Sequence, residues 1–368
     1  MNRFAISLAG PEDDAQLRAR MAQGRMEGAI AISFRREPSF FAGCPLQGEA
    51  TQVVKCTDHA TGTIIGLGSR STSPSWVDGE LRRIGYLADL RLAPEHRGGP
   101  LLARGYRFFR KLHLSDPVPF YTTVIYEGNR PALGTLVGGR AGLPLYRDWG
   151  RLLTPAIHLD LPARQAKAPG VEIERGSWAR LPEIVSFLNH GQRQKQFSPH
   201  YQEADFEGGR FAGLAPGNFF LAVRRGRIVG TAAAWDQAAL RQAHVERYSR
   251  MVQWIRPAYN ALTRLTPLKP LPGPGARIPF VYLACLAAED NDVGVFRHLV
   301  RAAHEHLRRG PWHYAIAGLH ESDPLAEVLS EFRAIPAAGR MFVAHFPDEP
   351  LAIETISRRI PYLEAGCL

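Results

Sequence analysis

One stretch of the sequence combines residue types that could bind a phosphate group. Residues 86–102 read Tyr-Leu-Ala-Asp-Leu-Arg-Leu-Ala-Pro-Glu-His-Arg-Gly-Gly-Pro-Leu-Leu, which predicts a strand, a glycine-containing turn and the start of a helix. Such a turn directs free backbone N–H groups and the positive end of the helix towards an anion. Glycine lets the backbone approach a phosphate closely, and Arg97 could add a charge-assisted contact. A tight turn without a ligand explains the glycine pattern alone equally well.

This stretch resembles the coenzyme-binding motif of the GNAT superfamily of N-acetyltransferases. In that family the fourth strand ends in alternating apolar residues and Pro, followed by Arg-Gly-x-Gly-x-Gly and a helix, and residues 90–99 match this pattern. A second family motif, Asn-x-x-Ala after the fifth strand, matches residues 129–132 at the expected separation. The resemblance rests on motifs over residues 3–160 and only on the order of secondary structure over residues 171–346.

The resemblance implies that acetyl-CoA, or another acyl-CoA, is the cosubstrate, and that no metal takes part. The residues that it assigns to the coenzyme are Leu90, Leu92, Arg97, Gly98, Gly99, Leu101, Leu102 and Asn129. The second and third glycines of the family motif fall on Pro100 and Leu102 in this sequence. Because Pro100 has no N–H group, at least one pyrophosphate contact must be lost or shifted.

The implied reaction is the attack of an amine on an acyl thioester, which needs a base for the amine and an acid for the thiolate. The thioester oxygen is expected to accept a hydrogen bond from a backbone N–H of residues 90–92. Asp89 is the candidate base, although an ion pair with a neighbouring arginine is the commoner role of such a carboxylate. Residues 133–137 lack the tyrosine acid of many relatives. Tyr126 and Tyr146 are the substitutes, although packing is the commoner role of each.

The same order of predicted elements occurs twice along the chain: strand–helix, hairpin, strand–loop–helix, strand–helix, strand. Residues 152–159 are predicted as the last strand of the first copy, and residues 340–346 as that of the second. The repeat is one of pattern only, without residue-level similarity. The sequence therefore predicts an α/β protein with mixed sheets, built from two tandem GNAT acyl-CoA N-acyltransferase folds that pack as one body.

The predicted division of the chain has two domains, as its length also suggests. Residues 1–162 form an acyl-CoA-binding N-terminal domain, residues 163–170 a linker that contains Pro and Gly, and residues 171–368 a degenerate C-terminal copy. In the second copy the loop from Glu289 to Asp292 has no arginine and three carboxylates, which would repel a pyrophosphate.

The second copy also carries a predicted insertion at about residues 241–279. Residues 243–265 read as helical, and a Pro-rich loop follows them. Trp254, Tyr259 and Leu262 form an aromatic and apolar stripe, for which core packing or a dimer face is a simpler interpretation than a lipid or ligand groove.

Composition narrows the choice of partner and compartment. The 368 residues include 45 Lys and Arg and 35 Asp and Glu, giving a formal net charge of +10, which favours anionic partners. The arginines are scattered, so we expect no nucleic-acid partner. The four cysteines show no zinc spacing, which fits a reducing compartment. No signal peptide or long apolar window is visible, so we expect a cytoplasmic protein without a membrane partner, as a monomer or homodimer.

We therefore expect an acyl-CoA-dependent N-acyltransferase, with acetyl transfer to the amine of a small-molecule acceptor that could also be anionic. The acceptor cleft is expected beside the end of strand 84–92, with one wall from the second copy. Its candidate residues are Tyr282, His320, Glu321 and residues 358–362. The alternative is a catalytically inactive GNAT-fold binding or regulatory protein that retains CoA or ligand binding.

Overall fold

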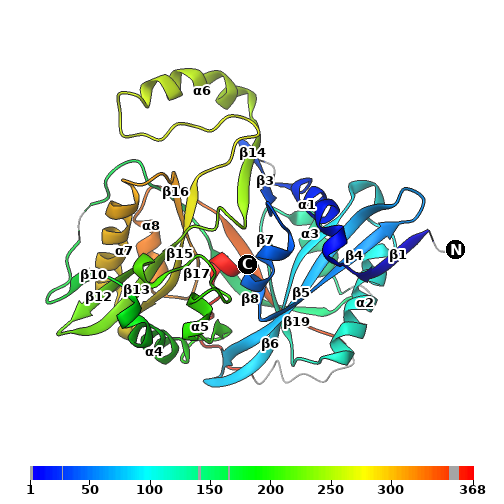
Figure 1. Ribbon diagram of the computed structural model, residues 1–368, viewed down its shortest axis with the longest axis horizontal. Coiled ribbons are helices and arrows are strands. Elements are labelled where there is room, and N and C mark those ends of the chain that lie inside the picture. The colour runs from blue at the N-terminus through cyan, green and yellow to red at the C-terminus, as the bar shows by residue number, and fades with distance from the viewer. Residues whose placement is uncertain (1–2, 27, 140–141, 165, 348–355) are drawn as a thin grey trace.

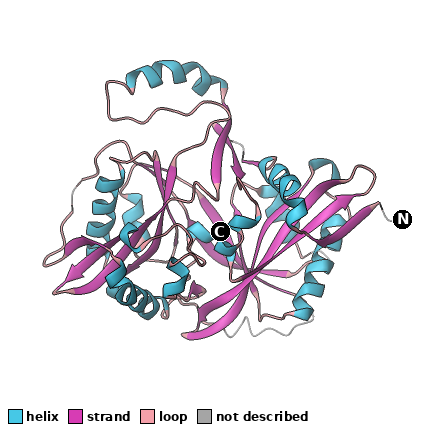
Figure 2. Cartoon of the chain, in the orientation of Figure 1, coloured by secondary structure: helices cyan, strands magenta, loops and turns pink. Residues whose placement is uncertain are grey.

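The computed structural model describes residues 3–26, 28–139, 142–164, 166–347 and 356–368, so residue 165 of the predicted linker lies outside the described residues. Figure 1 shows two lobes side by side, an arm that carries α6 above them, and the last residues of the chain between the lobes. Each lobe combines a sheet with helices (Figure 2), which confirms the predicted mixed α/β class.

The sheet of the first lobe comes mostly from the N-terminal half of the chain. Among the described residues it has nine strands, and β6 to β7 is a parallel pair. In spatial order the strands are β1 (Phe4–Leu8), β4 (Ala50–Asp58), β5 (Thr63–Val77), β6 (Glu80–Leu92), β7 (Tyr121–Tyr126), β19 (Ala338–His345), β8 (Leu145–Leu153) and β17 (Leu319–His320), with β11 (Ser198–Pro199) beside β5.

The sheet of the second lobe repeats this arrangement with the C-terminal half of the chain. Its seven strands, within the part of the chain that the structure describes, are β10 (Glu172–Arg175), β12 (Phe219–Arg224), β13 (Arg227–Trp235), β15 (Phe280–Ala288), β16 (Tyr314–Ala317), β9 (Ala156–His158) and β18 (Ala334–Ile335). The strand β15 pairs with β16 in parallel, as β6 does with β7.

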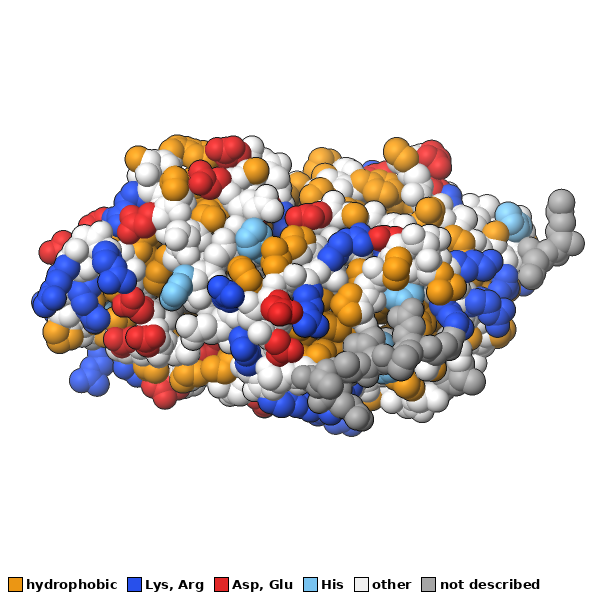
Figure 3. Space-filling model, turned by 90° about the horizontal axis from the view of Figure 1, so that it is seen from below, with side chains coloured by type: hydrophobic (Ala, Val, Ile, Leu, Met, Phe, Trp, Pro, Cys, Tyr) orange, Lys and Arg blue, Asp and Glu red, His pale blue; other side chains and the backbone are white. Residues whose placement is uncertain are grey.

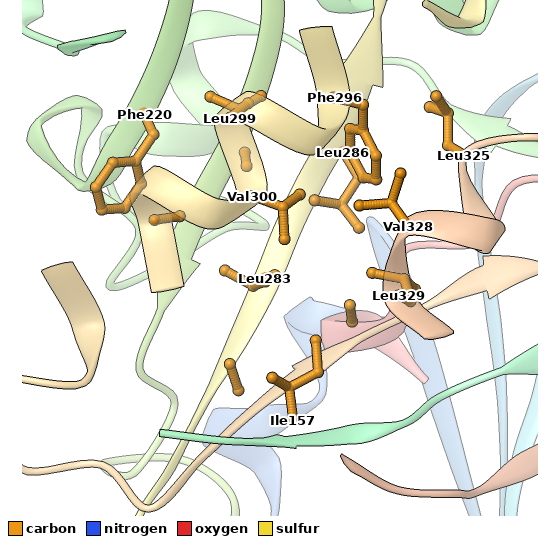
Figure 4. Close-up of a cluster of buried hydrophobic side chains, with 14 of the residues drawn as sticks. Ile157, Phe220, Leu283, Leu286, Phe296, Leu299, Val300, Leu325, Val328 and Leu329 are labelled. Atoms are coloured by element: carbon orange, nitrogen blue, oxygen red, sulfur yellow. The ribbon is translucent and has the colours of Figure 1, made fainter. Parts of the chain in front are cut away.

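The two lobes exchange their closing strands. The strand β19 of the second half lies between β7 and β8, and β9 of the first half lies between β16 and β18. Residues 152–159 are therefore two strands in two sheets rather than the single predicted strand. The break falls at Thr154 and Pro155, where proline cannot donate to a ladder. Figure 4 shows Ile157 of β9 in the core of the second lobe, near Leu283 and Leu329.

Helices cover the sheets because alternate strand residues face opposite sides. Val53 packs with α1 on one face of the first sheet, whereas its neighbour Val54 packs with Tyr106 and Phe109 of α2 on the other. The helices are α1 (Asp14–Ala22), α2 (Leu101–Ser115), α3 (Arg130–Leu136), α4 (Leu181–Gln192), α5 (Glu203–Phe206), α6 (Arg250–Leu262), α7 (Val293–Leu307) and α8 (Ala326–Ser330).

A small third sheet joins the lobes at the base of the arm. It consists of β14 (Gln242–Tyr248), β3 (Ile30–Arg35) and β2 (Arg25–Met26). The prediction of one helix over residues 243–265 was wrong, because the first six of these residues belong to β14, which pairs with β3 of the other half of the chain. Across the described residues, no helix is long and apolar enough to span a membrane.

Candidate functional site

The strands β6 and β7 separate after a short parallel pairing. Only Gly85 with Tyr121 and Tyr86 with Thr122 are paired in register. Beyond them a side-chain hydrogen bond, from Thr123 Oγ1 to the carbonyl oxygen of Leu87 at 2.8 Å, still links the strands. From there β6 continues along β5, and β7 continues along β19. The first sheet therefore opens at the carboxyl ends of β6 and β7.

A β-bulge lies on β6 beside this opening. The register changes from Leu67 opposite Arg91 to Ser69 opposite Ala88, so that Gly68 faces both Asp89 and Leu90. Asp89 has a φ of 58°, in the left-handed region. A bulge leaves a residue out of the regular ladder. The bulge places the N–H groups of Asp89 and Leu90 beside this opening.

The side chain of Asp89 is held by three donors. Its Oδ2 accepts from Arg36 Nη2 at 2.6 Å, Gln47 Nε2 at 2.9 Å and Ser69 Oγ at 3.0 Å. Burial acts to raise the pKa of Asp89, but the charges of Arg36 and Arg241 outweigh it and the net shift is downward. A carboxylate with a lowered pKa is a weak base. The geometry therefore favours the ion-pair role for Asp89, with Arg36 as its partner.

The loop after β6 presents backbone donors and a cation to solvent. Arg97, Gly98 and Gly99 are exposed, and Gly98 has a φ of 80°. Arg97 donates to the carbonyl oxygen of Leu92 at 3.1 Å, which positions its guanidinium over the loop. Pro100 occupies the N-cap of α2 without a side-chain capping bond, so the first N–H groups of this 15-residue helix have no acceptor from a cap. A helix terminus of this kind favours an anion.

An apolar pocket lies beneath this loop, between α2 and the strands. Leu90, Leu92, Leu101 and Leu102 line it together with Phe109 and Gly68, and its volume is about 50 Å³. A Cβ atom at Gly68 would lie 3.2 Å from the ring of Phe109, so glycine there keeps space below the bulge. The predicted coenzyme residues 90–102 are thus brought together around one pocket and one helix terminus.

The other predicted residues lie at the end of β7 or in the core. Asn129 is the N-cap of α3, and its Oδ1 accepts from Ala132 N at 3.3 Å. Tyr126 is exposed at the carboxyl end of β7. Tyr146 is partly buried and its hydroxyl is 2.7 Å from that of Tyr106, which favours a packing role.

A buried cationic cluster between the lobes was missed by the sequence analysis. The Nη1 of Arg241 donates to the carbonyl oxygens of Gly366 at 3.3 Å and Leu368 at 2.7 Å. Its Nε and Nη2 are buried without a hydrogen-bond partner in the described residues. Within the described residues, no Asp or Glu side chain forms an ion pair with Arg241. Its guanidinium is close enough to Asp89 and Arg36 for the charges of both to act on its pKa. Isolated arginines that are far apart in the sequence form no local pattern that predicts their contact in the fold.

Not all of the residues predicted for the acceptor wall lie near Arg241. Tyr282 is partly buried; burial raises the pKa of its hydroxyl, and the charge of Arg241 acts to lower it. His320 lies on β17, four strands from β6, which corresponds to roughly 19 Å, and it is 2.8 Å from the Trp149 carbonyl oxygen. Glu321 accepts from Arg151 N at 2.9 Å, and Arg358 lies over the ring of Trp149. Of the four predicted parts of the acceptor wall, only Tyr282 lies near Arg241.

Comparison with solved structures relates this architecture to known folds. A GCN5-related N-acetyltransferase from Sphaerobacter thermophilus matches over 95% of this chain and 98% of its own, with 11% identity and a TM-score of 0.56. Saccharomyces cerevisiae N-myristoyltransferase with bound myristoyl-CoA matches over 99% and 90%, with 10% identity and a TM-score of 0.63. A GCN5-related N-acetyltransferase from Anabaena variabilis matches over 93% and 72%, with 11% identity and a TM-score of 0.52.

The chain has the GNAT fold. The two lobes repeat it in tandem, as the sequence predicted. No family model matches the chain, and no curated protein matches it in sequence.

The bulge of the second GNAT copy is occupied by the chain itself. Ala232 faces both Cys285 and Leu286, and Cys285 has a φ of 52°. The N–H of Cys285 donates to Glu364 Oε2 at 2.8 Å, and the N–H of Leu286 donates to the hydroxyl of Tyr362 at 3.1 Å. Burial raises the pKa of Glu364. Both bulge donors of this copy are therefore satisfied by residues 362–364.

The helix terminus of the second copy is closed as well. Asp292 caps α7, with its Oδ1 accepting from Val295 N at 3.0 Å. Glu289 accepts from Arg227 at 3.0 Å across the same loop. The carboxylates that were predicted to repel a pyrophosphate thus occupy the position that an anion would take.

Proposed function

We propose that the protein is an acyl-CoA-dependent N-acyltransferase whose first copy binds the coenzyme. The observation that carries this proposal is the uncapped start of α2, which follows Arg97, Gly98 and Gly99 beside the opening between β6 and β7. The pyrophosphate would accept hydrogen bonds from these backbone groups and a charge-assisted contact from Arg97. Asn129 borders the same opening at the end of β7.

The bulge supplies the polarising group of the proposed reaction. The N–H groups of Asp89 and Leu90 would donate to the thioester oxygen as it gains negative charge. Arg36 and Arg241 make the surroundings of this oxygen positive, and Asp89 holds Arg36 in place. The collapse of the tetrahedral intermediate would then release the CoA thiolate, which needs a proton.

Two tyrosines could donate that proton. Tyr126 is the exposed tyrosine at the end of β7, and Tyr86 lies on β6 three residues before the bulge. Burial raises the pKa of Tyr86, which makes this tyrosine the weaker acid. Single Tyr86→Phe and Tyr126→Phe variants identify the donor, because loss of a general acid lowers kcat about a hundredfold or more.

We expect acetyl-CoA as the donor, and the pocket under the bulge has an apolar lining that suits an aliphatic acyl group. The yeast neighbour holds myristoyl-CoA. A series of acyl-CoA donors of increasing chain length, compared by kcat/KM, tests how much of this pocket the acyl group fills.

The proposed acceptor is an amine that also carries an anionic group. Arg241, with two unpaired nitrogens, is the candidate partner of that group, and it also lines a small pocket with Asp236, Arg277 and Trp312. We expect acceptors with a carboxylate or phosphate to react faster than simple alkyl amines. An Arg241→Met variant should remove this preference.

Titration calorimetry with acetyl-CoA is the direct test of coenzyme binding. Arg97→Glu should abolish measurable binding, because it places a carboxylate where the pyrophosphate would lie. Arg225→Glu makes the same charge change at an exposed turn of the second copy and should leave binding unchanged. Equal affinity of wild type and Arg97→Glu would refute the coenzyme site. Binding without thiol release on any amine would instead support the inactive alternative.

A further inference from the structure

The arm has a defined structure that leaves one face of α6 uncovered. After β14 the chain forms α6 and returns along residues 266–279 (Figure 1). The inner face of the helix is fixed to this return: Asn260 exchanges two hydrogen bonds with Leu271, at 2.9 and 3.0 Å, and the hydroxyl of Tyr248 donates to the Pro272 carbonyl oxygen at 2.7 Å. The arm is therefore a folded unit, and its outer face is not covered by its own chain.

The outer face is apolar and exposed. Met251, Trp254, Ile255 and Leu262 follow the spacing of one face of α6, and Leu265 comes just after the end of the helix. Their side chains are 70%, 85%, 54%, 49% and 86% exposed. Core packing, one of the two interpretations favoured from the sequence, was wrong for Trp254, because the arm extends away from both lobes. A contiguous apolar stripe of this kind marks an interaction surface.

The charge of the arm has one sign. Residues 247–279 contain six basic residues and no Asp or Glu; the basic residues are Arg247, Arg250, Arg256, Arg264, Lys269 and Arg277. Arg250 and Arg264 are exposed next to the stripe. The opposite face of the molecule, by contrast, mixes acidic and basic side chains (Figure 3). The partner of the arm must therefore accept apolar side chains and carry negative charge.

We propose that the arm binds the surface of an anionic lipid bilayer, with α6 lying in the interface. The headgroup region of such a membrane binds an exposed tryptophan, an apolar helix face and flanking arginines favourably. A second copy of the chain would bring the same positive charge against the arm. A folded acidic protein would need a complementary surface, whereas the residues of the stripe line neither of the two pockets described above.

This surface differs from a membrane span, and the proposal is independent of acyl transfer. The sequence-based expectation of no membrane partner rested on the lack of a long apolar window. An interfacial helix needs only one apolar face.

Cosedimentation of the full chain with vesicles tests the proposal. The wild-type protein should bind phosphatidylglycerol-rich vesicles, should bind pure phosphatidylcholine weakly, and should be released by high salt. The double variant Trp254→Ser/Leu265→Ser should bind about tenfold or more weakly, because two anchors are lost. The matched control, Trp178→Ser/Leu114→Ser, removes the same residue types at exposed positions away from the arm and should bind as wild type does.

Three results would overturn the proposal. One is wild-type protein that stays in the supernatant with both kinds of vesicle. Another is equal vesicle binding by the two double variants. The last is a dimer in sedimentation velocity that the Trp254→Ser/Leu265→Ser variant alone dissociates, which would make a second copy the partner. Unchanged melting and unchanged acetyl-CoA titration of this variant show that its fold and the coenzyme site are intact.

Discussion

Eight residues, 93–100, connect β6 to α2 in the first copy, whereas four residues, 289–292, connect β15 to α7 in the second. Two other features are equal in the copies. Both helices have 15 residues, and in both strands three residues follow the bulge residue, Asp89 or Cys285. The copies therefore share the strand, the bulge and the helix, and they differ in the length of the loop and in what occupies the bulge and the helix terminus.

In the second copy each position that could hold an anion holds a side chain of the protein. Asp292 occupies the helix terminus and Glu364 accepts from the bulge N–H. In the first copy the helix terminus has no capping side chain. The difference indicates that an internal carboxylate can replace a ligand and keep the strand–bulge–helix unit stable without coenzyme.

Cutting the chain between residues 162 and 163 should have the largest effect. The first half would lose β19 from the middle of its sheet, and the second would lose β9 and Ile157 from its core. We expect neither half to unfold cooperatively in thermal circular dichroism, because each would expose unpaired strand edges. If both halves melt cooperatively at the full-length temperature, the two copies are independent and the strand exchange is dispensable.

Asp89→Asn should lower the free energy of unfolding by about 3–5 kcal/mol at neutral pH, since it leaves the buried Arg36 without its counter-charge. The folded-state pKa of Asp89 is below its unfolded value of 3.8, so its stabilisation is complete above that pH and is lost as the pH falls through the folded-state pKa. Urea unfolding of wild type and variant should therefore differ at pH 7 and converge in acid.

Glu305→Gln is the control for this pH dependence. Hydrogen bonds from Arg308 and Arg309 hold the pKa of Glu305 at about 2, but this carboxylate and both of its arginine partners are partly exposed. Its loss should cost about 1 kcal/mol or less. An equal loss in the two variants would show that burial of the Asp89 pair has no special effect.

Asp292→Ala should also have a small effect, about 1 kcal/mol of unfolding free energy, through loss of the α7 cap. It should not create a coenzyme site in the second copy, because the loop stays short and Glu364 still occupies the bulge. Titration of acetyl-CoA into the double variant Arg97→Glu/Asp292→Ala checks this. Restored binding would mean that Asp292 alone closes the second copy.

Local patterns were sufficient for the elements around the first site. The strand, turn and helix start predicted over residues 86–102 are observed, because the predicted strand 84–92 ends where β6 ends and α2 begins at Leu101. Proline, glycine and apolar periodicity act within a few residues, so they can be read from the sequence. Residues 243–248 were misassigned as helical, since the strand that pairs with β14 is β3, about 200 residues away in the sequence.

The sequence by itself determined the tandem GNAT order, the loop with Arg97, Gly98 and Gly99, and the acidic loop of the second copy. Only the tertiary structure decided that β9 and β19 change lobes, that Glu364 reaches Cys285 over 79 residues, and that Arg36 and Arg241 meet near Asp89. It also left the apolar face of α6 in solvent. The reason is that a backbone N–H, a strand edge or a buried charge accepts any partner of the right chemistry, and only the packing of the whole chain brings one of them within reach.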